Sequence, residues 1–190
     1  MDRSMHAYRN WRNQLVVFDE VDVLTIVEIE VGDRTFPLAH VIRAANKKTL
    51  RGIHEEIRSI QAEPGSSQSW ERRRFLRWVL FLPSLVRDLW YRVRSKSPHW
   101  VKRYMGTVAL TAVGMFGKGG GWGIAISNHT LGVTIGGIAE KPGAVEGRIE
   151  IREYLSITLD FDHDIIDGAP AARFTRRLKE LIECGYGLID

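Results

Sequence analysis

The residues of this sequence best suited to chemistry stand in the stretch HDIIDG, which supplies His163, Asp167 and Gly168. Imidazole titrates near neutral pH, so a histidine held in place can take a proton from an attacking nucleophile. On spacing alone, a histidine at the end of a strand is more often a structural residue than a catalytic one. The role of His163 therefore depends on the elements around it.

A strand and a helix are predicted on either side of this histidine. Apolar and polar residues alternate from residue 155 to residue 162, which is the pattern of a half-buried strand and puts His163 on the apolar face. Asp167 then occupies the position of a helix N-cap, an apolar stripe follows, and Gly185 ends the helix. We therefore expect the imidazole to be held between two rigid elements.

The HDIIDG stretch, with its His-x-x-x-Asp-Gly spacing, resembles the active-site signature of the catalytic domain of dihydrolipoamide acyltransferases, the core components of 2-oxo acid dehydrogenase complexes, and of the related chloramphenicol acetyltransferases. The resemblance extends to the flanking FDH and DGAPAARF, to the run GTVALTAVGMFG at residues 106–117, and to the first third of the chain. It implies an α+β fold, a chloramphenicol acetyltransferase-like mixed sheet flanked by helices. We expect residues 1–190 to be a single catalytic domain, without the family's amino-terminal elements, lipoyl domain or subunit-binding domain.

The resemblance implies thioester exchange, in which a thiol attacks an acyl group. A thiol has a pKa of about 8.5 and attacks as the thiolate, so a base must remove its proton. His163 is expected to be that base. In the family, a serine or threonine donates to the oxyanion of the tetrahedral intermediate, and the matching residue here is Thr111; one such donor lowers the barrier by roughly 3 kcal/mol. Without the resemblance, Thr111 would be an ordinary strand threonine.

The other site residues have supporting roles in this interpretation. Ser127, followed by Asn128, is the alternative hydroxyl donor if the register of the GTVALTAVGMFG run differs. Asp167 is expected to hold the shape of the site, to cap the helix or to pair with an arginine, and Gly168 to allow close approach of the backbone. Asp164 is a departure, because family members in dehydrogenase complexes usually carry arginine directly after the histidine.

The resemblance also implies substrates and partners. These are coenzyme A, as acyl-coenzyme A, and a lipoyl group presented in trans as an acyl carrier. The family assembles as trimers, so we expect a homotrimer or a higher assembly of trimers in which His163 of one subunit faces Thr111 of the next, with 2-oxo acid dehydrogenase components as further partners. The alternative is a catalytically inactive relative that serves as an oligomeric scaffold or regulatory partner; Asp164 favours it and the intact motif argues against it.

Composition sets the class of protein. The 190 residues, 44% hydrophobic and 26% charged, suit one soluble globular domain. The single cysteine, Cys184, excludes an internal disulfide framework and fits a reducing compartment. Since the polar first residues do not resemble a signal peptide, we expect a cytoplasmic protein. The other histidines lack paired ligand spacing, so no metal site is expected.

Positive charge concentrates in residues 70–105, which hold ten Lys or Arg and two acidic residues; this net +8 leaves −4 for the remainder of a chain whose total is +4. We favour two amphipathic helices with a kink at Pro83, whose Trp, Leu and Val residues pack in the core. A cationic surface for the phosphates of coenzyme A is a second explanation. An interfacial helix on anionic lipid is the least expected of the three, so membrane contact is not expected. Nucleic acid binding is not expected either, because no nucleic-acid-binding motif accompanies the charge.

The remaining elements follow from local patterns. Residues 15–18, 21–29 and 35–41 read as strands, and a helix capped by Thr49 or Asn46 follows. The glycine-rich residues 106–138 predict a hairpin with a long loop, in which glycines serve backbone packing more often than ligand contact. Turns at residues 141–143 and 146–147 are expected before a strand pair at residues 148–152 and 154–162.

Overall fold

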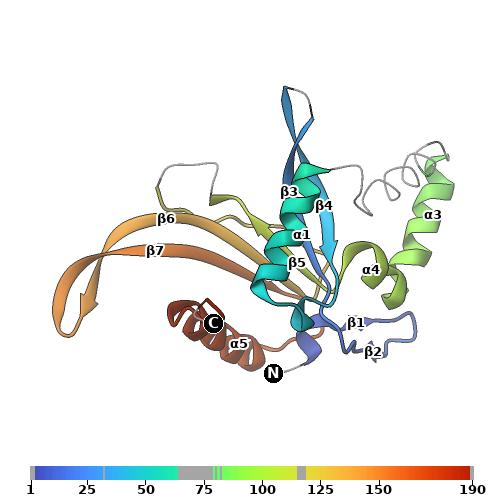
Figure 1. Ribbon diagram of the computed structural model, residues 1–190. Helices are drawn as coiled ribbons and strands as arrows, with labels where there is room; N and C mark the ends of the chain where they lie inside the picture. The colour runs from blue at the N-terminus through green and yellow to red at the C-terminus, as the bar shows by residue number, and fades with distance from the viewer. Residues whose placement is uncertain are drawn as a thin grey trace.

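The computed structural model describes residues 3–31, 33–63, 79, 81, 83–114 and 119–188 of the chain. Its centre is a five-stranded sheet in the order β4-β3-β5-β6-β7 (Figure 1). These strands span Val23–Val31 (β3), Arg34–Ile42 (β4), Val108–Ala112 (β5), Leu131–Val145 (β6) and Arg148–Phe161 (β7). The smaller elements before the first α-helix are Arg3–His6 (η1), Tyr8–Arg9 (β1), Leu15–Val16 (β2) and Ala45–Lys47 (η2). The α-helices are Leu50–Ala62 (α1), Ser84–Ser95 (α3), Pro98–Met105 (α4) and Gly168–Glu183 (α5).

The sheet is mixed. β3 pairs with β4 antiparallel and with β5 parallel. β5 pairs with β6 parallel, and β6 pairs with β7 antiparallel. The expected α+β fold, a mixed sheet flanked by helices, is therefore confirmed.

The expected hairpin across residues 106–138 is wrong, because β5 and β6 run in the same direction, with Thr111 beside Thr134. A local apolar pattern does not distinguish parallel from antiparallel pairing. Parallel neighbours need a connection of about a dozen residues or more, and the segment between β5 and β6 is long enough to return the chain to the same edge.

Glycines bring this connecting segment close to β6. Gly137 N donates to Gly121 O at 2.9 Å. A Cβ built at Gly136 would stand 2.2 Å from the same oxygen, which is closer than any real side chain allows. The expected backbone packing is therefore found at Gly136 and Gly137, whereas a Cβ built at Gly119 or Gly121 meets nothing within 4 Å.

One face of the sheet is apolar and carries α1 and α5. Ile60 of α1 packs with Val27 and Ile29, while Phe161 of β7 meets Phe174 of α5 edge-on, with ring centroids 6.0 Å apart. Residues two apart along a strand share a face. The alternate residues therefore face away from the helices. The polar residues among them are Thr111, Thr134, Thr158 and Asp160.

The ribbon formed by β6 and β7 extends away from the rest of the chain (Figure 1). Residues 141–143, expected as a turn, lie inside β6, and the turn is at Glu146 and Gly147, both with positive φ. The expected strand pair at residues 148–152 and 154–162 is one strand, β7. Apolar side chains remain exposed on this ribbon, including Ile149 at 83% and Ile151 at 65%.

The basic window contains α3 and α4, which follow Pro83. Its residues 70–78, 80 and 82 lie outside the described residues. Two amphipathic helices were expected on either side of a kink at Pro83, with their apolar residues in the core. For α3, which follows Pro83, the core packing is wrong, because α3 contributes no buried residue. Trp90 of α3 meets Trp100 of α4 edge-on, with centroids 5.6 Å apart. Among the residues that the structure describes, no helix has the length and apolar character to cross a membrane.

Candidate active site

His163 lies in the tight turn that joins β7 to α5. The backbone oxygen of Asp162 accepts from Ile165 N at 3.0 Å and Ile166 N at 2.9 Å, and its side chain accepts from Asp164 N at 3.0 Å. Ile166 is 2% exposed and anchors the turn in the core. Since β7 ends at Phe161, His163 is exposed in the turn and does not lie on the apolar face of the strand. Within the described part of the chain, its ring makes no hydrogen bond or ion pair.

Asp167 and Gly168 begin α5. Asp167 is in the N-cap position with extended backbone, but its exposed side chain makes no capping hydrogen bond. Its carbonyl accepts from Ala171 N at 3.2 Å. A Cβ built at Gly168 meets nothing within 4 Å, so the close backbone approach expected at this glycine does not occur among the described residues of one chain.

Arg9 of β1 contacts the same turn. Its guanidinium donates to the carbonyl oxygen of Asp164, and its Nη1 lies 3.9 Å from the Asp164 carboxylate. Asp164 stands where the family resemblance implies an arginine, and the cation Arg9 from another segment lies beside it. Sequence reasoning missed Arg9, because the two residues are 155 positions apart.

Thr111, the expected oxyanion donor, lies on the polar face of the sheet. It is half-buried beside Thr134 of β6, which in turn lies opposite Thr158 of β7. Thr134 is 2% exposed, and its hydroxyl has no hydrogen-bond partner in the described part of the chain. A row of hydroxyl groups therefore crosses three adjacent strands.

The register separates Thr111 from His163 in a single chain. Thr111 is two strands away from Thr158, and His163 follows Thr158 by five residues. At about 3.3 Å per residue and about 4.8 Å per strand, the separation is roughly 15 to 20 Å. A base and an oxyanion donor must both lie about 3 Å from reacting atoms. One chain therefore does not bring the two residues into one site.

Ser127, the alternative donor, is engaged elsewhere. Its hydroxyl lies 2.9 Å from His129 Nδ1, and His129 Nε2 lies 2.7 Å from the carbonyl oxygen of Met105. A carbonyl only accepts, so Nε2 carries the proton and Nδ1 accepts from the Ser127 hydroxyl. Burial lowers the pKa of His129, while its hydrogen bond to Met105 opposes this in part. The neighbouring Asn128 is exposed.

Tyr8 is buried beside His129. Its ring centroid lies 6.3 Å from that of His129, and its hydroxyl donates to Gly106 O at 3.1 Å. Burial raises the pKa of Tyr8, so the phenol stays neutral.

From the sequence, His129 was considered only as a metal ligand. In the residues that the structure describes, no three His, Cys, Asp or Glu side chains gather as a metal site would require.

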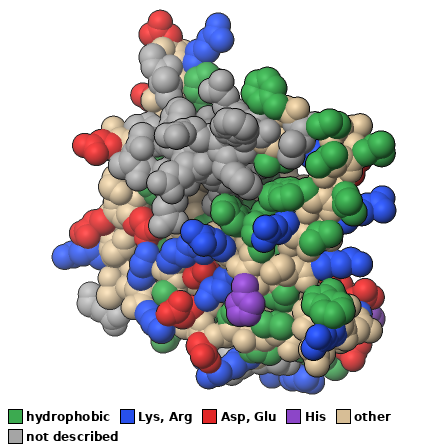
Figure 2. Space-filling view, turned by 90° about the vertical axis from the view of Figure 1, so that its right-hand side faces the viewer, with side chains coloured by type: hydrophobic (Ala, Val, Ile, Leu, Met, Phe, Trp, Pro, Cys, Tyr) green, Lys and Arg blue, Asp and Glu red, His purple; other side chains and the backbone are tan. Residues whose placement is uncertain are grey.

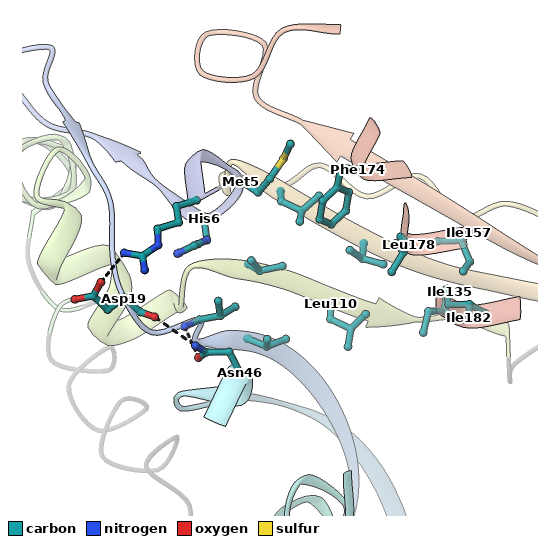
Figure 3. Close-up of a pocket in the computed structure, with 16 residues that line it drawn as sticks. Met5, His6, Asp19, Asn46, Leu110, Ile135, Ile157, Phe174, Leu178 and Ile182 are labelled. Carbon is teal, nitrogen blue, oxygen red and sulfur yellow. Dashed lines mark hydrogen bonds and ion pairs between the residues drawn. The ribbon is translucent and has the colours of Figure 1, made fainter. Parts of the chain in front are cut away.

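A cavity of about 570 Å³ lies on the opposite, helix-covered face. Apolar side chains of the sheet and of α5 face each other across it, and polar side chains line one end; Figure 3 labels among them Leu110, Ile135, Leu178, His6, Asp19 and Asn46. Since Leu110 faces the cavity, the adjacent Thr111 points to the other face of the sheet. The sheet therefore separates this cavity from the expected oxyanion donor.

Comparison with known proteins relates this arrangement to a family. Residues 82–188 match the model of the 2-oxoacid dehydrogenases acyltransferase (catalytic domain). The dihydrolipoyllysine-residue succinyltransferase component of the mitochondrial 2-oxoglutarate dehydrogenase complex of Saccharomyces cerevisiae is 36% identical over 78 residues, or 41% of this chain and 17% of that protein. The chain therefore spans about a sixth of the length of this relative.

Solved structures share the fold. The crystal structure of a probable dihydrolipoamide acetyltransferase from Listeria monocytogenes 4b F2365 matches with a TM-score of 0.62 and 18% identity, covering 95% of this chain and 63% of that one. Azotobacter vinelandii dihydrolipoamide acetyltransferase matches with a TM-score of 0.61 and 21% identity, covering 94% and 60%. These structures support the fold, and the family match covers more than half of the chain. The chain therefore belongs to the family of 2-oxoacid dehydrogenase acyltransferase catalytic domains.

Proposed function

We propose that this chain is a coenzyme A-dependent acyltransferase that moves an acyl group between the thiols of coenzyme A and dihydrolipoamide. The observation that carries this proposal is the exposed His163, held on an anchored turn in the family's His-x-x-x-Asp-Gly motif. An imidazole that the described chain leaves without a hydrogen bond is accessible to a substrate thiol.

Thr111 is the hydroxyl that we assign to the oxyanion. It is half-buried on the polar face of the sheet, whereas Ser127 already donates to His129. The structure of the Azotobacter vinelandii relative was studied for the roles of a serine, a histidine and an asparagine in its catalytic mechanism. This supports an imidazole and a hydroxyl as the reacting pair.

The site is completed by a second subunit. The sheet register separates Thr111 and His163 of one chain by several strand positions. A trimer, or a higher assembly of trimers, resolves this separation if His163 of one subunit faces Thr111 of the next. The exposed Ile149 and Ile151 of the β6–β7 ribbon supply apolar surface for such contacts.

The proposed reaction is an exchange of one thioester for another. The thiol sulfur attacks the carbonyl carbon of the thioester while His163 takes the thiol proton, and the carbonyl becomes an oxyanion that accepts a hydrogen bond from Thr111 of the neighbouring subunit. The intermediate then collapses, its carbon–sulfur bond to the leaving thiol breaks, and the imidazolium returns the proton to that sulfur. Arg9, through Asp164, holds the turn in place.

The substrates in this proposal are acyl-coenzyme A and a lipoyl group presented in trans. Since the Saccharomyces cerevisiae relative is a component of the 2-oxoglutarate dehydrogenase complex, components of such complexes are the proposed partners. The second candidate function is an inactive scaffold or regulatory subunit. It is favoured by Asp164, which stands where family members usually carry arginine.

The test is acyl transfer from acetyl-coenzyme A to free dihydrolipoamide, with the size of the assembly recorded on the same samples. His163→Ala should lower kcat at least a hundredfold, by roughly the contribution of a general base. His54→Ala, which changes an exposed histidine of α1, is the matched control. Absence of transfer by a correctly assembled wild type would favour the scaffold.

A further inference from the structure

The helix α3 presents an apolar row to solvent. Leu85, Leu89 and Val93 recur every four residues and therefore share one side of the helix. Their exposed fractions are 82%, 65% and 63%. Trp90, on the adjacent side, packs against Trp100 of α4 and fixes the orientation of the helix. The row is therefore held outward by a packed helix.

Two cations lie along this row. With about 100° between successive residues of an α-helix, Arg92 lies next to Leu85, whereas Arg94 lies away from the row, on the side of the helix that carries Trp90. Lys96 follows at the C-cap. The single acidic residue of α3, Asp88, lies farther from the row than Arg92 does. On the face that carries α3 and α4, hydrophobic side chains lie at the surface among Lys and Arg side chains (Figure 2).

A tryptophan from another segment extends the surface. Trp11 is 70% exposed, and it lines a groove together with Val93 and Lys96. The guanidinium of Arg12 stands over its ring, 4.6 Å from the centroid. Tryptophan is enriched where a protein meets the headgroup region of a bilayer, because one part of its ring system is apolar and another is polar.

We propose that this surface, the α3 face, docks on a bilayer that contains anionic lipid. The α3 face consists of Leu85, Leu89, Val93, Trp11, Arg12, Arg92 and Lys96. Its apolar side chains enter the headgroup boundary, and its cations contact lipid phosphates. The protein lies on the surface of the membrane and does not span it.

The position of the cations favours lipid over a protein as the occupant of the α3 face. Protein interfaces are depleted of lysine, although they are enriched in arginine and tryptophan. In the α3 face, Lys96 follows the apolar row at the C-cap and Arg92 lies beside the row, so an occupant must offer anions and apolar chains close together. Anionic lipid does this, and binding to it gains from both buried apolar area and electrostatic attraction.

The test is sedimentation of the full chain with vesicles of equal parts phosphatidylcholine and phosphatidylglycerol, and with vesicles of phosphatidylcholine alone. We expect binding to the first and little to the second, weakened by added salt. Arg92→Gln with Lys96→Gln should lower binding about twentyfold to thirtyfold, since each basic residue near an anionic surface contributes about a fivefold factor. Leu85→Ser with Leu89→Ser should remove it.

Two matched controls change similar residues elsewhere. Arg176→Gln with Arg177→Gln alters exposed cations of α5, and Leu188→Ser alters an apolar residue that is 77% exposed. Both should bind like the wild type. The proposal is overturned if the wild type binds neither vesicle, if the charge and apolar variants bind normally, or if the same variants instead disrupt self-association of the protein.

Discussion

Arg9 of β1 and Asp164 of the His163 turn form an ion pair, with 3.9 Å between Arg9 Nη1 and Asp164 Oδ2. The same guanidinium donates to the Asp164 carbonyl, so one side chain holds both the carboxylate and the backbone. The two side chains are 40% and 81% exposed. An exposed pair of this kind contributes only about 0 to 1 kcal/mol to stability. Its importance lies in the placement of the residue next to His163.

Loss of Arg9 should therefore affect catalysis more than stability. We expect Arg9→Gln to lower kcat roughly tenfold by loosening the turn, with a change in the free energy of unfolding below about 1 kcal/mol. Kinetics and urea unfolding measure the two effects. Arg3→Gln, which breaks the exposed pair with Asp19 away from the turn, should leave kcat unchanged. A loss of stability that accounts for the loss of activity would contradict this role.

Asp22 holds together the ends of several elements and is 2% exposed. It pairs with Arg43 at 2.8 Å, and its other carboxylate oxygen accepts from Ala44 N at 2.9 Å. Asp22→Ala would leave Arg43 without this partner, so we expect a loss of about 3 kcal/mol in the free energy of unfolding. Asp19→Ala, at the exposed pair with Arg3, should cost less than about 1 kcal/mol. Equal losses for both variants would be inconsistent with the network.

Stability should depend on pH through His129. Burial lowers the pKa of His129 from its ordinary value of 6.5, so the unfolded chain binds this proton more readily than the folded chain. The stability that neutral His129 contributes is therefore complete above 6.5 and is lost as the pH falls below it toward the lower folded pKa. Tm measured between about pH 7 and about pH 5 should fall less steeply in His129→Gln than in the wild type.

The control for this pH dependence is His54→Gln, which changes an exposed histidine of α1. It should keep the slope of the wild type. If His129→Gln had the same slope as well, the buried imidazole would not be the source of the acid sensitivity.

Alanine should be costly at one glycine and tolerated at another. A Cβ at Gly136 would meet Gly121 O at 2.2 Å, so Gly136→Ala should cost about 2 kcal/mol or more in the free energy of unfolding. A Cβ at Gly168 meets nothing within 4 Å. Gly168→Ala should therefore change the free energy of unfolding by less than about 0.5 kcal/mol. Thermal or urea unfolding of the two variants is a direct comparison, and a tolerated alanine at Gly136 would contradict the close packing of the connecting segment.

The strand and helix around His163 were predictable because their signals are local. Alternation in β7, the N-cap position of Asp167 and the positive φ of Gly185 all depend on neighbouring residues. The cap of α1 was predictable for the same reason, and Thr49 accepts from Gly52 N at 3.1 Å.

Other features depend on partners far along the chain and left no local signal. The parallel pairing of β5 with β6 has the same alternation as a hairpin. The contacts of Arg9 with Asp164 and of His129 with Met105 join separate segments. An amphipathic pattern also does not say what covers the apolar side of a helix, which is why the exposure of Leu85 and Leu89 was not foreseen.

The most direct test of a site shared between subunits is complementation. Thr111→Val and His163→Ala, each expressed alone, should be inactive or nearly so, because every site of each assembly lacks one group. In randomly mixed trimers, about a quarter of the sites would combine an intact His163 with an intact Thr111. We predict that co-expression restores up to about a quarter of the wild-type transfer from acetyl-coenzyme A to dihydrolipoamide. Mixed assemblies that form normally and stay inactive would contradict the shared site.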